Sequence, residues 1–461
     1  MREIVTGSDI DRVHRAGQGE MIISEAAIVT GIAREKADKL GIRLVSGSSA
    51  ALPGLLAGAR SSGNSAFIPS FAHGGQVAAS PGTPGYDLEA WRKKFPILKT
   101  AIHVANCSQS PQCDATREAA LSYLDNWNGM GMDWGRWMEE IALAKAEFAR
   151  LINADPSEIA IGTSISELTS TIASSLPLDT GRTRVVTTDA EFPTVGNVWN
   201  AFRKYGFDPV FIPLRDGRID PSEYDRVLDE RTLIASIFDV YYYNGFKQDL
   251  KAIIPKIHAA GALAYVDAYQ GIGSHPIDVK ALDIDMLGTG NLKYLCGIPG
   301  VAFLYVKKEL VPYLNPAFTG WFGQSNPFAF KLELDYAKDA RRFDNGTPPV
   351  MTAYIARAGM AVINEVGPAA IQAWTDILSR RCIDGALARG LEVASPLDIA
   401  RKAPTTAIRV GKDSHAVEVA LLKRGIIASA RGDVVRIAPH FFTRLEDIDL
   451  VLDAMVKVLQ K

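Results

Sequence analysis

Short runs of β-branched and apolar residues alternate with helical stretches between residues 158 and 305, and this alternation constrains the fold more than any other feature. Uninterrupted apolar runs of this length are typical of strands buried on both faces. Strands that alternate with helices predict an α/β fold with a mostly parallel sheet covered on both sides. Helices are expected over Ser164–Leu176, Thr194–Tyr205 and Leu250–Ala260. The expected buried parallel strands are Glu158–Ile161, Arg184–Thr187, Pro209–Ile212, Leu233–Phe238, Leu263–Val266 and Val301–Tyr305.

The region before this pattern has a different composition. Residues 1–45 favour a small module with helices over Glu25–Gly31, capped by Ser24, and over Ala33–Leu40. Residues 46–85 are rich in Ser, Gly, Ala and Pro, with Arg60 as their only charged residue. This composition is typical of a flexible linker.

The C-terminal part begins with a long helical stretch near Ala340 and contains two strand candidates, Thr405–Val410 and Val434–Ala438. This pattern indicates a smaller α+β domain. We therefore expect four parts: residues 1–45, the linker 46–85, a large domain over 86–335 with its entry segment, and a small domain over 336–461.

The charge balance and the cysteines exclude several classes of protein. The 461 residues carry a formal net charge of -2, so electrostatics give no reason to expect binding to nucleic acid or to an anionic membrane. The apolar runs are too short to span a bilayer, and the first residues show no signal peptide. The four cysteines have no metal-ligand spacing, which predicts no metal site and favours a reducing cytoplasm.

Asp267 and Gln270 follow the expected strand Leu263–Val266. Ligands of open α/β sheets bind at the carboxyl ends of strands. An aspartate there can keep a pyridine nitrogen protonated, and Gln270 can donate a hydrogen bond to a phenolic oxygen on the same ring. The alternative is that Asp267 only caps the next loop.

Lys293 lies among small and apolar residues just before another expected strand. Partial burial lowers the pKa of an amine, and a Schiff base requires a neutral amine. The neighbouring glycines allow the backbone to approach a flat cofactor. A surface lysine in a turn is the alternative interpretation.

A phosphate site is also expected, where the strand Glu158–Ile161 leads through Gly162, Thr163 and Ser164 into a helix. Backbone N–H groups and hydroxyls at a helix start bind anions, although Thr163 or Ser164 can equally act as a plain N-cap. Phe192 follows another strand end and can stack on a ring, or belong to the core.

Together, Asp267–Gln270, Lys293 with Gly297-Ile298-Pro299-Gly300, and Gly346-Thr347-Pro348 resemble the aminotransferase class V family of fold-type I pyridoxal 5′-phosphate (PLP) enzymes. The resemblance runs from about Ile97 to Lys461 and implies a mostly parallel seven-stranded sheet and a homodimer. It implies a PLP Schiff base on Lys293, with Asp267 on the pyridinium nitrogen, Gln270 on the phenolate oxygen and Phe192 on the ring. Phosphate would be held by Thr163, Ser164, Thr289 and Asn291, and Trp321 and Thr347 would reach the cofactor of the partner subunit.

The substrate end of the site is also implied by this resemblance. Arg436 matches the arginine that binds the substrate α-carboxylate in this family, and a guanidinium can donate two parallel hydrogen bonds to a carboxylate. A salt bridge at the strand edge is its alternative role. Asn106 and Ser108 lie in the segment that lines the substrate pocket.

Three reaction types stay open. The stretch Gly425–Asp433 has no thiol, so a persulfide-forming cysteine desulfurase is not expected. We expect transamination or C–S/C–C lysis of an α-amino acid, with epimerisation or racemisation as alternatives, because all of these use the same named residues.

The N-terminal segment resembles the opening of an ethanolamine-utilisation accessory protein of bacterial microcompartments, in Ile4-Val5-Thr6, Asp9-Ile10 and His14-Arg15-Ala16-Gly17. This suggests docking to a compartment shell or partner through residues 1–85, or an added stabilising module. A PLP-binding transcriptional regulator is the alternative from another class. It would need a basic face, but residues 1–45 carry seven positive and seven negative charges.

Overall fold

The computed structural model describes residues 4–5, 7–23, 27–29, 31–46 and 83–460. The expected linker 46–85 and its apolar stretches, together with Ser24, therefore lie mostly outside the described residues. The chain divides into two compact units. The first contains the described residues up to Ser46, and the second carries the α/β pattern.

The N-terminal unit has its own small apolar core. Its strands pair in parallel, β1 with β3 and β2 with β4. The predicted helix over Glu25–Gly31 is wrong, because the β-branched pair Ile28–Val29 is extended and pairs with Ile4–Val5. The elements are β1 (Ile4–Val5), α1 (Gly7–Arg15), β2 (Glu20–Ile23), β3 (Ile28–Val29), α2 (Gly31–Leu40) and β4 (Arg43–Ser46).

The second unit is built on a seven-stranded sheet with the order β6-β12-β11-β10-β9-β7-β8. The expected mostly parallel sheet is confirmed, but β12 runs antiparallel to both of its neighbours, so the parallel assignment of Val301–Tyr305 is wrong. The glycine-rich strand β11 was not predicted. The strands are β6 (Ile159–Gly162), β7 (Arg184–Thr188), β8 (Asp208–Ile212), β9 (Thr232–Phe238), β10 (Leu263–Asp267), β11 (Met286–Gly290) and β12 (Ala302–Val306).

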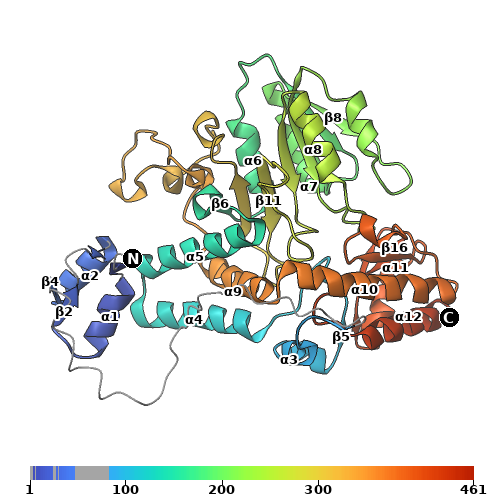
Figure 1. Cartoon of the computed structure of the whole chain (residues 1–461), viewed down its shortest axis with the longest axis horizontal. Helices are drawn as coiled ribbons and strands as arrows, with labels where there is room; N and C mark the ends of the chain where they lie inside the picture. The colour runs from blue at the N-terminus through green and yellow to red at the C-terminus, as the bar shows by residue number, and fades with distance from the viewer. Residues whose placement is uncertain (1–3, 6, 24–26, 30, 47–82, 461) are drawn as a thin grey trace. The chain divides into compact units, whose positions relative to one another are not determined.

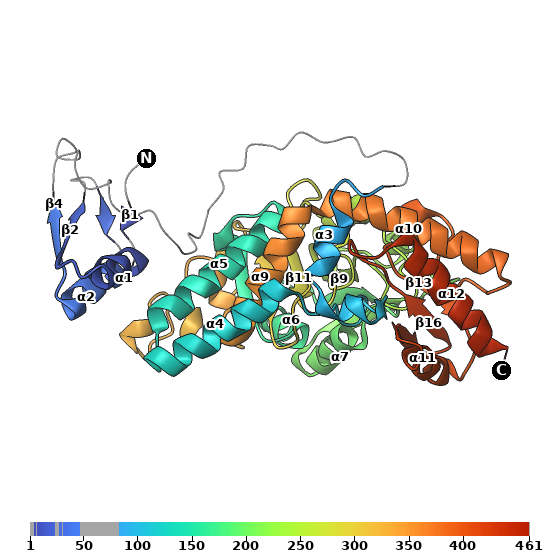
Figure 2. The same cartoon turned by 90° about the horizontal axis from the view of Figure 1, so that it is seen from below.

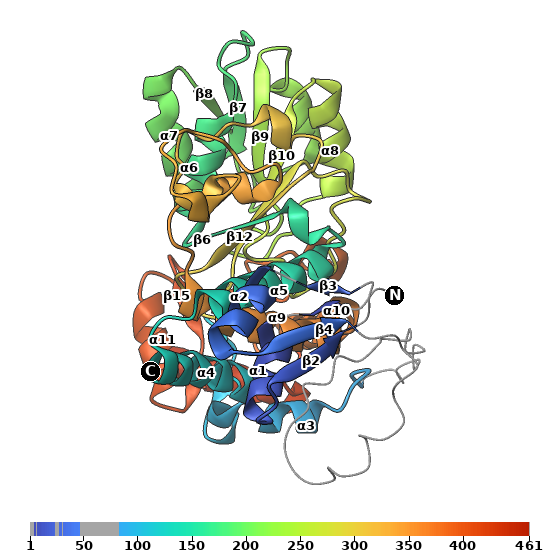
Figure 3. The same cartoon turned by 90° about the vertical axis from the view of Figure 1, so that its left-hand side faces the viewer.

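Alternate residues of the central strands enter two different cores. Ile159 and Ile161 belong to the core that contains α8, whereas Ala160 belongs to the core that contains α6 and α7. Figure 3 shows α6 and α7 on one side of the strands and α8 on the other. The sheet is therefore buried on both faces, as its continuous apolar strands predict. These helices are α6 (Ile165–Ser175), α7 (Pro193–Phe202) and α8 (Leu250–Ala259).

A second, smaller sheet of the order β13-β16-β15 lies in the C-terminal part. Helices α10 and α12 run side by side over it and share its core (Figures 1 and 2). The entry segment belongs here as well, because β5 pairs with β14. The elements are β5 (Ile102–His103), α10 (Pro368–Ala388), β13 (Thr406–Arg409), α11 (Ser414–Leu422), β14 (Ile426–Ile427), β15 (Ser429–Arg431), β16 (Val434–Ile437) and α12 (Leu445–Leu459).

The remaining helices connect these parts. Helix α9 packs Ala353, Ala356 and Met360 into the core of the large sheet. No helix among the described residues is long and apolar enough to cross a membrane. These helices are α3 (Leu88–Lys93), α4 (Asp114–Met130), α5 (Trp134–Ile152) and α9 (Val350–Val366).

Candidate active site

A cavity of about 360 Å³ lies where strands β7, β9 and β10 end and helix α6 begins. Ligand sites of open α/β sheets are expected at this edge. The small domain contributes to the same wall through β15 and β16. The cavity brings together most of the residues predicted from the sequence, namely Ser108, Thr163, Ser164, Phe192, Asp267, Gln270, Lys293 and Arg436.

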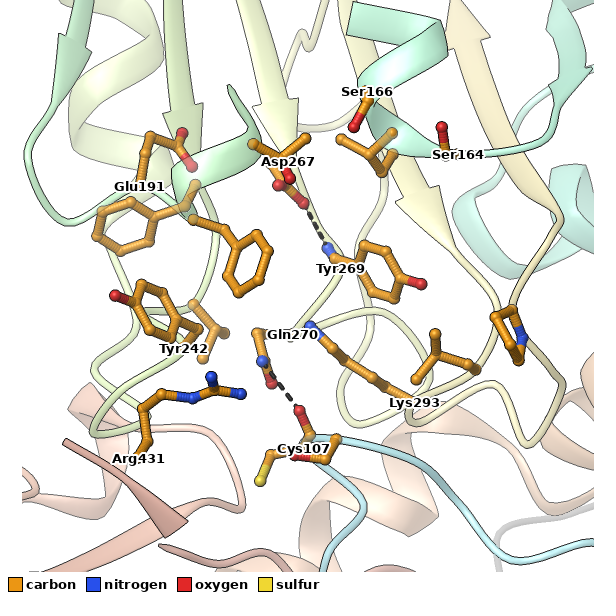
Figure 4. A pocket seen from close by; sticks show the side chains of 18 of the residues that line it. Cys107, Ser164, Ser166, Glu191, Tyr242, Asp267, Tyr269, Gln270, Lys293 and Arg431 are labelled. Atoms are coloured by element: carbon orange, nitrogen blue, oxygen red, sulfur yellow. Dashed lines mark hydrogen bonds between the residues drawn. The ribbon is translucent and has the colours of Figure 1, made fainter. Parts of the chain in front are cut away.

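Lys293 follows β11, and its amine points into the cavity beside Gln270 (Figure 4). The Nζ atom lies 4.1 Å from the centre of the Tyr269 ring and 5.6 Å from the centre of the Phe192 ring. Burial lowers the pKa of Lys293 to about 8, although the charge of Asp267 acts in the opposite direction. A large fraction of the amine is therefore neutral in mildly alkaline solution and can act as a nucleophile.

Asp267 is the last residue of β10 and only 7% of it is exposed. Its Oδ1 atom accepts a hydrogen bond from the backbone N–H of Tyr269 at 2.9 Å. Burial raises the pKa of Asp267, and the hydrogen bond and the charge of Lys293 offset part of this effect. A cationic group placed against this carboxylate would stabilise its charged form.

Gln270 comes three residues after Asp267 in the loop behind β10. Its Nε2 atom donates to the backbone carbonyl of Cys107 at 3.1 Å, which orients the amide at the cavity wall. Figure 4 shows this bond below Lys293. The second N–H of the same amide group remains for a ligand.

Helix α6 starts at the opposite end of the cavity from Arg431 (Figure 4). Ser164 is its N-cap and accepts from the N–H of Glu167 at 3.2 Å, so the N-cap interpretation is confirmed. The N–H of Thr163 donates to the Glu167 carboxylate at 2.6 Å. The N–H groups of Ile165 and Ser166 and the hydroxyl of Ser166, which lines the cavity, remain for an anion.

Arg436 lies in β16 and is only 1% exposed. Its guanidinium donates to the Ser429 hydroxyl at 2.6 Å, to the Tyr242 carbonyl at 2.7 Å and to the Ser108 hydroxyl at 2.9 Å. No carboxylate lies within ion-pair distance of it among the described residues. The arginine therefore has no salt bridge there, and its buried positive charge can be compensated by a ligand carboxylate.

Five predicted residues do not line this cavity. Asn106 is fully buried, donates to the Ala438 carbonyl at 2.8 Å and accepts from the Ser110 hydroxyl, so its amide holds the entry segment on β16. The Thr289 hydroxyl donates to the Gly290 carbonyl at 2.8 Å, and Asn291 is buried without a partner for its amide. Trp321 and Thr347 do not line the cavity either, and their role toward a partner subunit stays a prediction.

Several cavity residues were not singled out as site residues from the sequence. Tyr269 lies between Asp267 and Gln270, and this position could have indicated it. Glu191 is buried with its Oε1 atom unpartnered, and burial together with the charge of Asp267 raises its pKa well above the usual value. The sequence around four further cavity residues does not indicate a site, because packing between distant parts of the chain brings them to the cavity. These residues are Cys107, Ser166, Tyr242 and Arg431.

Comparisons with known proteins identify the family of the chain. The sequence matches the family described as "Aminotransferase class-V" over residues 105–445. It is 37% identical to the uncharacterized aminotransferase YcbU of Bacillus subtilis (strain 168), over 79% of this chain and 96% of the relative. It is 27% identical to a kynureninase of Salinispora tropica, over 78% of this chain and 90% of the relative.

Solved structures share the fold. An apo cysteine desulfurase from Thermococcus onnurineus NA1 superposes with a TM-score of 0.73 at 22% identity, covering 81% of this chain and 98% of its own. A C-DES mutant with glycine covalently linked to its PLP cofactor superposes with a TM-score of 0.72 at 18% identity, covering 79% and 98%. The family match covers most of the chain, and the chain is therefore an enzyme of the aminotransferase class V family.

Proposed function

We propose that this enzyme holds PLP on Lys293 and acts on an α-amino acid as an aminotransferase or a C–S/C–C lyase. The observation that carries the proposal is one cavity lined by a lysine of lowered pKa, a buried carboxylate and a buried arginine that has no counter-ion among the described residues. When bound, PLP supplies a protonated pyridine ring that withdraws electrons from the substrate α-carbon.

The described residues fit that cofactor. Asp267 has a carboxylate whose buried charge a ring N–H⁺ would stabilise, and Gln270 has a free N–H for the phenolate oxygen. Phe192 and Tyr269 present aromatic rings near the Lys293 amine, with ring centres 5.6 Å and 4.1 Å from Nζ. The start of α6, with Thr163, Ser164 and Ser166, is the anion-binding end.

In this proposal, Arg436 and Lys293 have separate roles in binding the substrate and in moving a proton. Arg436, oriented by Ser108 and Ser429, would hold the substrate α-carboxylate through a bidentate contact. Once substrate is bound, the neutral amine of Lys293 would take the proton from the α-carbon and return it. These roles are shared by transamination, lysis and epimerisation, and the persulfide route is not proposed because Gly425–Asp433 contains no thiol.

The test is an absorbance spectrum of the purified protein after addition of PLP. A band at about 410–430 nm is expected from the bound cofactor, and Lys293→Ala should abolish it. Lys402→Met is a matched control, because Lys402 is also a buried lysine with a pKa of about 8 but lies beside Cys382 and Thr406, outside the cavity. If the wild-type protein shows no band, the proposed cofactor is wrong.

A panel of amino acids separates the reaction types. Conversion of the band to the absorbance of the aminated cofactor, with release of a keto acid, identifies transamination. Release of pyruvate, alanine or a sulfur species without that conversion identifies a lyase. Inversion of the α-carbon without either product identifies an epimerase.

The proposal includes a homodimer in which Trp321 and Thr347 reach the cofactor of the partner subunit. The segment around Trp321 supports this, because Phe318, Phe328, Phe330 and Leu332 are exposed. Exposed apolar side chains in this density are typical of a protein interface. Light scattering that gave the mass of a single chain at micromolar concentration would contradict it.

We also propose that residues 1–85, with the module of residues 1–45, dock the enzyme to a compartment shell or a partner protein. Support comes from the separate apolar core that the described residues of this unit form. A chain that begins at Thr83 should keep its PLP band and its activity but lose its localisation in cells. Unchanged localisation would contradict docking and would favour the alternative, in which the N-terminal module only stabilises the enzyme.

A further inference from the structure

A second arginine points into the cavity and is not used by the proposed reaction. Arg431 is the last residue of β15, and Figure 4 shows its guanidinium directed toward Gln270. Among the described residues, no hydrogen bond or ion pair engages this guanidinium. The wall therefore carries a solvent-exposed cation with no protein partner among the described residues.

The acidic groups closest in sequence are already engaged. Asp433, two residues further on, accepts from the Tyr243 hydroxyl and pairs with Arg409. Glu418 accepts from the N–H of Ala430 at 3.1 Å and contacts His415 at 3.0 Å. Neither carboxylate compensates Arg431.

The antiparallel pairing of β15 and β16 puts Arg431 and Arg436 on the same face. Ser429 lies opposite Arg436, and Arg431 follows two residues after Ser429, so its side chain leaves the same side of the strand. Diagonal neighbours of this kind have Cβ atoms about 7–8 Å apart. Both side chains line the cavity, so two guanidinium groups on the same face can each bind one end of a short dianion.

The charges of the cavity leave one of these arginines unmatched after an ordinary amino acid binds. The acidic residues on the wall are Asp267 and Glu191. Asp267 is assigned to the cofactor, and burial together with the charge of Asp267 raises the pKa of Glu191, which favours its neutral form. The phosphate end, at Ser164 and Ser166, is at the other side of the cavity (Figure 4).

We propose that Arg431 binds a second anionic group on the substrate side chain, so that the enzyme acts on short acidic amino acids of the aspartate or glutamate type. A carboxylate, sulfinate or sulfonate at that position would make a charge-assisted contact with the guanidinium. A cavity of about 360 Å³ that must also hold the cofactor favours a short side chain. This inference rests on the proposed function for the α-amino end of the substrate.

The first experiment measures binding without turnover. Glutarate has two carboxylates and pentanoate has one on a chain of equal length, and their dissociation constants for the holoenzyme are compared by calorimetry. We expect glutarate to bind about 10- to 100-fold more tightly, since a charged hydrogen-bonded contact contributes about 1.5–3 kcal/mol. Arg431→Gln should remove this advantage, and Arg431→Lys should restore part of it.

Two further variants serve as controls. Arg424→Gln removes an exposed arginine of the same domain that donates only to the Ala420 carbonyl, and it should keep the preference for glutarate. Arg436→Gln should weaken both ligands, because both lose the contact for their first carboxylate. Equal binding of glutarate and pentanoate to the wild-type enzyme would overturn the inference. So would equal weakening of both ligands by Arg431→Gln, which would assign Arg431 to the α-carboxylate.

The second experiment uses substrates and separates this inference from the proposed function. Aspartate is compared with asparagine, and glutamate with glutamine, by the change in the cofactor absorbance. An acidic preference that is lost in Arg431→Gln supports the inference. A cofactor band that responds equally to the acidic and amide forms contradicts it while the proposed function stands. If no band forms at all, the proposed function fails, and the glutarate measurement repeated on the protein without PLP decides whether the cavity binds two anionic groups.

Discussion

At the residue scale, Lys293 has its reactivity set by burial. The pKa of the amine is lowered to about 8 because the cavity removes it from water, while Asp267 favours the charged form. The two effects leave the amine partly neutral near neutral pH.

This predicts how the capture of PLP by the cofactor-free enzyme depends on pH. Protonation blocks the nucleophile, so the capture rate should fall about tenfold per unit below pH 8 and level off above it. Stopped-flow absorbance between pH 6 and 9.5 gives the profile. Lys402→Met should leave the profile unchanged, and a rate that is independent of pH in this range would contradict the assignment.

At the scale of the element, β11 requires glycine at two positions that face tyrosine rings. A Cβ on Gly290 would lie 2.0 Å from the Tyr269 ring, and one on Gly288 would lie 2.6 Å from the Tyr265 hydroxyl. The absence of a side chain at Gly290 therefore leaves room for the ring of Tyr269, which lies next to the amine of Lys293. Glycine weakens the strand signal in the sequence, which explains why β11 was missed.

We predict that Gly290→Ala displaces the Tyr269 ring. Overpacking of this kind costs about 1–3 kcal/mol, so the midpoint of urea unfolding should fall and PLP should bind more weakly. Gly196→Ala in α7 is the matched control, since its nearest neighbour beyond the helix is an aromatic carbon of Phe211 at 3.4 Å. Unfolding and PLP binding that are the same in Gly290→Ala as in this control would contradict the prediction.

At the scale of the whole molecule, the entry segment is tied to the last helix by a buried ion pair. Arg92 of α3 donates to Asp447 of α12 at 2.8 Å and to the Phe442 carbonyl at 2.6 Å. Both side chains are almost fully buried. The entry segment also contains Ser108, which accepts a hydrogen bond from Arg436. The ion pair of Arg92 thus anchors this segment at residues that do not line the cavity.

Arg92→Leu should lower the free energy of unfolding by about 3–5 kcal/mol, because it leaves the charge of Asp447 buried and unpaired. The double variant Arg92→Leu with Asp447→Leu should recover part of that loss, since both buried charges are then removed. Chemical denaturation measures both values. A double variant that loses the sum of the two single effects would show that the pair is not coupled.

The sequence alone determined the class of the fold and indicated the residues proposed to hold the cofactor. Continuous apolar strands specify burial on both faces locally. Asp267 and Gln270 were recognisable because they follow a predicted strand, and Lys293 because it lies among small and apolar residues just before another. The antiparallel direction of β12 was not recognisable, because strand direction depends on connections and partners outside the strand.

Tertiary structure alone decided which residues form the wall of the cavity. Asn106 and Ser108 lie in one short segment, yet packing against β16 turns the amide of Asn106 to the Ala438 carbonyl and the hydroxyl of Ser108 to Arg436. Arg431 and Arg436 share a face only because β15 and β16 pair in this register. Hydrogen-bond partners, burial and the shifted pKa values all arise from groups distant in the chain, so the sequence near each residue does not contain them.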